Sequence, residues 1–172
     1  MKNVLASAVL STLLLISAKS LAGTPGGLQI LVLRSAESAR FDKLVDEYFS
    51  RHHPDDGAGC LDALLNIDSV TSGTPLKNVG ASDVFDAATS KSKHKTLARK
   101  LERFRDTSHQ HGYDAAFAYR NEGEQLVFYA VGAFTLAPVG VSKLPLSSLQ
   151  NLESVDKAIC EALVKIPVNM EP

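Results

Sequence analysis

Two apolar runs in the second half of the chain most strongly limit what it can fold into. They cover residues 113–119 and 125–131, and both are rich in the aromatic and β-branched residues that favour strands. Between them, Asn121 to Glu124 (NEGE) has the length and composition of a hairpin turn. A hairpin breaks the strict strand–helix alternation of a doubly wound fold. We therefore predict a single α+β domain with a mainly antiparallel sheet and about three packed helices.

The rest of the chain supplies the other predicted elements. Residues 28–34 (LQILVLR) form a nearly continuous apolar run, which predicts a buried strand. Apolar residues at helical spacing predict three amphipathic helices. The segment 60–70 is ambiguous, because its pattern fits either a short helix or a strand. The predicted helices are 41–53, ended by Pro54, then 93–109, and 149–163 with Ser147 or Ser148 as its cap. Ser82 is predicted to cap a short turn over 84–88, and 133–137 is a predicted strand.

The hairpin leaves one alternative open. Phe117 and Tyr119 can face either Val127 and Tyr129 or Leu126 and Phe128, because a slip of one residue turns a strand over. The sequence does not decide between these two registers.

The N-terminal segment is typical of a secretory signal peptide. Lys2 precedes an uncharged apolar run of about 14 residues, which ends in the small residues around Ala22. The run is too short to span a membrane of about 30 Å as a helix. We predict cleavage after residue 22, which leaves a single domain over 23–172, located in a periplasm or outside the cell. No later run approaches the length of a membrane span.

Removal of residues 1–22 takes away two lysines and no acid. The remaining 150 residues then hold 16 basic and 19 acidic side chains, a net charge of −3. A negative domain of this kind disfavours nucleic acid as a partner, because phosphate binding depends on positive charge.

The chain has two cysteines, Cys60 and Cys160. In an exported protein two cysteines most simply form one disulfide, which here would close a loop of about 100 residues. The alternative is a catalytic thiol at Cys60, which follows the glycine-bearing turn 57–59. We predict the disulfide.

A basic stretch at residues 91–105 is the strongest local signal of binding. It carries seven basic residues and one acid, a local charge of +6 in an acidic chain. The stripe of Leu97, Leu101 and Phe104 would face the core and leave the cations in solvent. One interpretation is a solvated helix balanced by acids elsewhere. The other is docking to an acidic surface, which is a partner protein, a phosphorylated lipid headgroup or, least favoured, nucleic acid. For docking, the predicted contact residues are Lys93, Lys95, Arg99, Lys100 and Arg103.

The five histidines do not form a recognisable metal or catalytic motif. The pairs 52–53 and 109/111 lack the spacing of a zinc site, and helix-end positions explain them more simply. Nucleotide, phosphate and nucleophile-elbow motifs are also missing from the sequence. The sequence thus predicts no catalytic residue, metal ligand or cofactor, and it leaves the oligomeric state open.

Two functions follow from these features. The first is a small exported binding protein that acts through protein–protein contacts, as an inhibitor or an immunity-type antagonist of a toxin or enzyme does. The second is a small secreted hydrolase using histidine with a carboxylate or with Cys60. The candidates are His52, His53, Asp55, Asp56, Cys60, His109 and His111. The sequence favours the binding protein.

Overall fold

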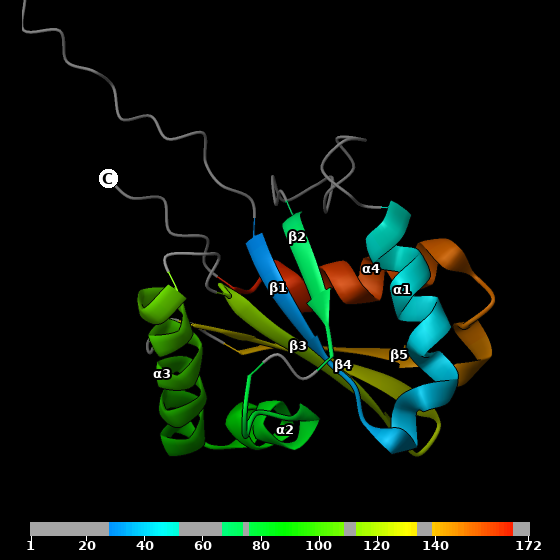
Figure 1. Cartoon of the computed structure of the whole chain (residues 1–172). Helices are drawn as coiled ribbons and strands as arrows, with labels where there is room; N and C mark the ends of the chain where they lie inside the picture. The colour runs from blue at the N-terminus through cyan, green and yellow to red at the C-terminus, as the bar shows by residue number, and fades with distance from the viewer. Residues whose placement is uncertain (1–27, 52–66, 74–75, 109–112, 134–138, 167–172) are drawn as a thin grey trace, which may run out of the picture.

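The computed structural model describes residues 28–51, 67–73, 76–108, 113–133 and 139–166 (Figure 1). The predicted signal peptide lies outside these residues. Among the helices that the structure describes, none has the length and apolar character that a membrane crossing requires. The strands are β1 (Leu28–Leu33), β2 (Ile67–Ser72), β3 (Ala115–Glu122), β4 (Gln125–Gly132) and β5 (Val139–Pro145); the helices are η1 (Ala36–Phe41), α1 (Asp42–Arg51), α2 (Ala81–Thr89), α3 (Lys91–Ser108), η3 (Leu146–Ser148) and α4 (Leu152–Leu163).

The strands form one mixed sheet in the order β2-β1-β3-β4-β5. Strand β1 is parallel to both β2 and β3, whereas β4 is antiparallel to both β3 and β5. The predicted single-domain α+β fold is confirmed. Half of the strand pairings are parallel, so the sheet is mixed, and the described residues contain four α-helices where about three were predicted. The additional helix is α2, which the sequence suggested only as a turn.

Both faces of the sheet are buried, because side chains alternate along each strand. Ile30 and Val32 of β1 point into a core shared with α1 and α4. Leu31 and Leu33 point the other way, into a second core shared with α2 and α3. All four side chains are at most 1% exposed, which explains why β1 is a continuous apolar run in the sequence.

The hairpin of β3 and β4 is the predicted one, and its register is now defined. Gly123 and Glu124 make the turn, and Gly123 adopts the positive φ of 65° that glycine tolerates best. Tyr119 lies opposite Phe128, and the Phe117 ring stacks on Phe128 with 6.0 Å between centroids. The second of the two alternatives, in which Phe117 and Tyr119 share a face with Leu126 and Phe128, is therefore correct.

Several local predictions need correction. Residues 67–72 are a strand, which settles the ambiguous segment. The side chain of Asp83 accepts from the Gly80 amide at the start of α2, a position where Ser82 was predicted as the cap. Asn151, and neither predicted serine, caps α4 by accepting from the Ser154 amide at 3.2 Å. Strand β5 was not predicted, and most of the strand predicted over 133–137 lies outside the described residues.

Strand β5 lies unusually close to helix α4. A side-chain Cβ built on Gly140 would come within 1.7 Å of the carbonyl oxygen of Ala162. Next to this contact, the Ser142 hydroxyl donates to the carbonyl of Ala158, and Lys165 Nζ donates to the carbonyl of Val141 at 3.0 Å. The close approach of helix and strand therefore requires glycine at position 140.

Replacement of Gly140 by alanine should force α4 away from β5. We expect the free energy of unfolding to fall by about 1–3 kcal/mol, the usual cost of overpacking. Urea denaturation followed by circular dichroism measures this change. Gly80→Ala is the matched control, because a Cβ at position 80 has ample space: the nearest atom, the Ser82 hydroxyl oxygen, would lie 4.0 Å away. If both variants lost the same free energy of unfolding, the close contact between position 140 and Ala162 would not be the cause of the loss.

Candidate partner-binding surface

Helix α3 is held to the protein along one face. His94, Leu97, Ala98 and Leu101 are buried and follow the i, i+3, i+4, i+7 spacing of an amphipathic helix. A single residue, Ser90, separates α3 from α2, and its carbonyl accepts the first helical bond from the His94 amide at 2.9 Å. The two helices thus form a corner against one face of the sheet (Figure 1). This corner fixes the direction in which the basic side chains point.

Two of the five predicted contact residues are bound within the protein. Lys93 forms an ion pair with Asp86 of α2. Lys100 donates to Asp83 of α2 at 3.1 Å and to the carbonyl of Asn78 at 2.9 Å. These two lysines therefore connect α3 to α2 and its leading loop, and their charges are largely compensated.

Lys95 and Arg99 differ from these two lysines. Both are exposed, and neither has an acidic partner among the described residues. Lys91 shares these properties, although it was not among the predicted contacts. The predicted contact Arg103 belongs to α3, but its side chain lies outside the described residues. The uncompensated surface in the described part of α3 therefore consists of Lys91, Lys95 and Arg99, called the cationic face below.

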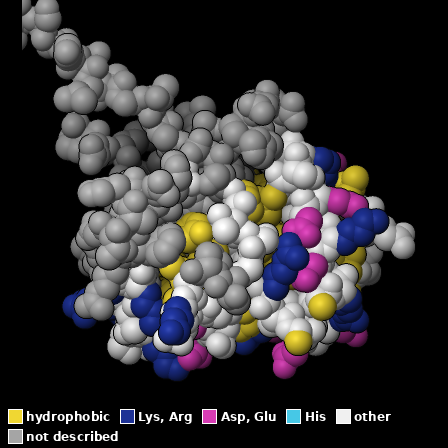
Figure 2. All heavy atoms as spheres, in the orientation of Figure 1, with side chains coloured by type: hydrophobic (Ala, Val, Ile, Leu, Met, Phe, Trp, Pro, Cys, Tyr) yellow, Lys and Arg dark blue, Asp and Glu magenta, His cyan; other side chains and the backbone are white. Residues whose placement is uncertain are grey.

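The distribution of charged side chains differs between the two ends of the surface in view. Figure 2 shows dark-blue Lys and Arg side chains gathered at the α3 end of the face in view. Near α1, dark-blue and magenta side chains lie side by side. Arg34 at the start of this region forms ion pairs with Asp42 and Asp46. Charge is thus balanced around α1 and remains positive at α3.

The position of the cations within α3 works against helix stability. The first turn of α3 holds Lys91 and Lys93 and no acid. The helix dipole places partial positive charge at this end, so cations here cost a few tenths of a kcal/mol each at low salt. Stability alone would favour acidic residues at these positions.

His94 is the one histidine whose structure is described. It is 7% exposed, and its Nε2 atom is buried without a hydrogen-bond partner among the described residues. The stripe predicted from the sequence did not include His94, although the spacing of His94 from Leu97 and Ala98 fits a buried position. The other residues of the hydrolase hypothesis, 52–60 and 109–111, lie outside the described residues. Within the described ranges, no group of three His, Cys, Asp or Glu side chains could hold a metal ion.

The tip of the β3–β4 hairpin is a second surface of defined geometry. Arg120 Nε and the Tyr129 hydroxyl both donate to Glu122 Oε1, the former at 2.6 Å. The Arg120 guanidinium also lies over the Phe85 ring of α2, 4.6 Å from its centroid. The hydrogen bond from Tyr129 is the main cause that holds the pKa of Glu122 below its usual value, and Arg120 adds to it. The charges of Arg120 and Glu122 therefore compensate each other within the cluster. The contact of Arg120 with Phe85 packs the hairpin against α2.

The predicted disulfide is only partly within the described residues. Cys160 lies in α4, half-buried, and packs against the core beneath α1. Cys60 lies outside the described residues. The pairing of the two therefore stays a prediction.

Comparisons with known proteins identify no relative. No family model, no curated protein and no solved structure matches this chain. A function must therefore be argued from the geometry and chemistry of the described side chains.

Replacement of Lys100 by methionine tests whether this lysine connects α2 and α3. The change keeps the apolar stem but leaves Asp83 and the Asn78 carbonyl without their donor. We expect the free energy of unfolding to fall by about 1 kcal/mol, measured by urea denaturation. The control Lys95→Met removes an exposed, uncompensated cation and should change stability by less than about 0.5 kcal/mol. If both variants lost the same free energy of unfolding, the hydrogen bonds of Lys100 to α2 and its loop would not contribute to stability.

The hairpin cluster should make stability depend on pH. Because the folded protein lowers the pKa of Glu122, its contribution is present above the unfolded pKa and is lost as the pH falls through the folded value. Between about pH 6 and about pH 3, wild type should lose more free energy of unfolding than Glu122→Gln. Glu124→Gln, at the exposed end of the turn, should keep the wild-type dependence. If Glu122→Gln keeps it too, the cluster is not coupled to folding.

Proposed function

We propose that this protein is a small exported binding protein whose cationic face docks on an acidic surface of a partner protein. The observation that carries the proposal is the exposure of Lys95 and Arg99 without acidic partners among the described residues, on a helix whose Lys93 and Lys100 are tied to α2. An inhibitor or an immunity-type antagonist of a toxin or enzyme fits this chemistry. The expected place of action is the periplasm or the extracellular space.

The rigidity of α3 supports a docking role. A helix that is already ordered loses little conformational freedom when it binds, so more of the contact energy remains as affinity. Here Leu97, Ala98 and Leu101 anchor the helix, and Lys100 fixes it to Asp83. The charge is also local, since the chain as a whole is acidic, and such a patch steers an oppositely charged partner into one orientation.

A protein partner fits this surface better than nucleic acid does. Single-stranded nucleic acid is bound by basic grooves that also present aromatic rings for stacking. The described exposed face of α3 carries lysine, arginine, serine and threonine and no aromatic residue. Carboxylates of an acidic protein need only the cations.

The hydrolase remains an alternative without structural support. Its histidines, carboxylates and Cys60 all lie outside the described residues, and His94 is buried within the α2–α3 corner. No observation on the described residues favours catalysis, so the binding role is the conclusion.

The double variant Lys95→Glu/Arg99→Glu tests the proposal. Tagged protein is used to recover partners from the native compartment, and the recovered proteins are then purified for titration. We expect the dissociation constant of the true partner to rise by at least about tenfold, because two attractive contacts become repulsive. Affinity for the wild type should also fall as salt is raised, because screening weakens exposed charge contacts.

The matched control is Lys43→Glu/Lys157→Glu. It makes the same change in net charge on exposed residues of α1 and α4. This variant should bind the partner as wild type does. Equal losses in the two double variants would reduce the effect to net charge, and unchanged binding of Lys95→Glu/Arg99→Glu would remove the cationic face from the interface.

A further inference from the structure

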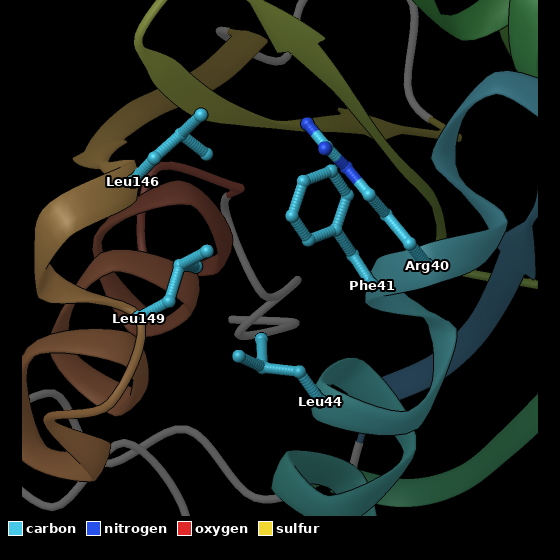
Figure 3. Close-up of a pocket in the computed structure, with 5 residues that line it drawn as sticks. All are labelled: Arg40, Phe41, Leu44, Leu146 and Leu149. Atoms are coloured by element: carbon cyan, nitrogen blue, oxygen red, sulfur yellow. The ribbon is translucent and has the colours of Figure 1, made fainter.

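A groove lies on the side of the protein that carries α1 and α4, away from α3. It is lined by Arg40 and Phe41 of η1, Leu44 of α1, Leu146 of η3, and Leu149; it is open to solvent and has a volume of about 360 Å³. Figure 3 shows the three leucines and the Phe41 ring around a common space, with the Arg40 side chain beside the ring. Segments about 100 residues apart in the chain thus build one site.

The floor of the groove is apolar and firmly supported. Phe41 is 5% exposed and belongs to the main core beneath α1 and α4. Leu44, Leu146 and Leu149 are half-buried and pack against the same core. Each leucine therefore keeps some apolar surface in contact with water, and a ligand that covers this surface would gain about 25 cal/mol for each Å² removed from water.

Arg40 supplies the single charge among the described residues that line the groove. Its guanidinium lies over the Phe41 ring, 4.5 Å from the centroid, which holds it at the groove. The side chain is exposed and has no acidic partner among the described residues. The neighbouring cations differ: Arg34 is paired with Asp42 and Asp46, and Lys43 with Glu47. Arg40 is therefore available to an anion from outside the described chain.

We propose that this groove binds a small aliphatic monocarboxylate, with its hydrocarbon chain on the three leucines and its carboxylate on Arg40. An arginine fork matches a carboxylate in two parallel hydrogen bonds, which an alcohol or an amine cannot reproduce. An apolar lining with one placed charge, in a few hundred Å³, is the usual composition of a small-ligand site. The site is separate from the cationic face, and either can fail without the other.

Octanoate is the probe that tests the groove. The purified ¹⁵N-labelled protein is titrated with octanoate and, separately, with octylammonium, which has the same chain and the opposite charge. Octanoate should shift the backbone amides of residues 40–44 and 146–149 in a saturable manner, and octylammonium should not. Equal shifts from both compounds would overturn the proposal, since the charge of Arg40 would then select nothing.

Variants separate the role of Arg40 from a general charge effect. Arg40→Gln should raise the dissociation constant for octanoate by about tenfold, the loss of one charged hydrogen-bonding partner. Lys43→Gln removes an adjacent exposed cation and should leave the dissociation constant unchanged. The amide spectrum of each variant outside the groove reports whether the fold is kept. Equal weakening by both variants, or none by Arg40→Gln, would contradict the assignment.

Two other occupants have distinct signatures in the same experiment. Amide shifts of the groove that depend on protein concentration without any ligand would identify a second copy of the chain as the occupant. Binding of a short peptide ending in a free leucine carboxylate, together with no response to octanoate, would identify a polypeptide terminus. Either result would overturn the proposal of a small monocarboxylate.

Discussion

The structure depends on a sheet whose central strands are buried on both faces. Residues 30–33 of β1 and residues 115–119 of β3 have almost no contact with water, so helices must cover both sides. The chain meets this requirement by sending α1 to one face after β1 and the α2–α3 corner to the other face after β2. The parallel pairing of β1 with β2 and β3 follows, because parallel strands need such crossover connections. This arrangement also places α3, which carries the cationic face, and α1, which contributes Leu44 to the Arg40 groove, on different sides of the molecule (Figure 1).

The sequence predicted best those elements whose pattern reflects their own burial. The apolar run of β1, the β3–β4 hairpin and the stripes of α3 and α4 follow directly from which side chains face a core. Strand β5 could not be predicted in this way, since its seven residues include Gly140 and Pro145, which normally argue against a strand. Gly140 is needed there because α4 approaches too closely for a side chain, and that contact joins positions 140 and 162. Similarly, the turn residues predicted the hairpin, but only the packing of Phe117 and Tyr119 on Phe128 shows its register.

The candidate sites also combine features that one sequence segment shows with contacts between segments far apart in the chain. The basic stretch is visible in the sequence, but its five predicted contacts were treated as equivalent. Their difference arises from Asp83 and Asp86, which approach Lys100 and Lys93 only because α2 turns sharply into α3 at Ser90. The Arg40 groove had no local signal, because its two halves are about 100 residues apart and neither half is unusual alone.

The charges of the α2–α3 corner indicate how stability and binding can share one helix. Lysines in the first turn of α3 oppose the helix dipole, and α2 offsets this cost with Asp86 on one side and Asp83 on the other. Both carboxylates lie on α2, so they neutralise the lysines that connect the helices. Lys91, Lys95 and Arg99 remain exposed, with no acidic partner among the described residues. An acidic partner, as proposed above, would then supply the countercharge that the described part of the chain does not provide. A partner that binds only the folded protein also stabilises it. The complex would therefore offset the electrostatic cost of the cations in α3.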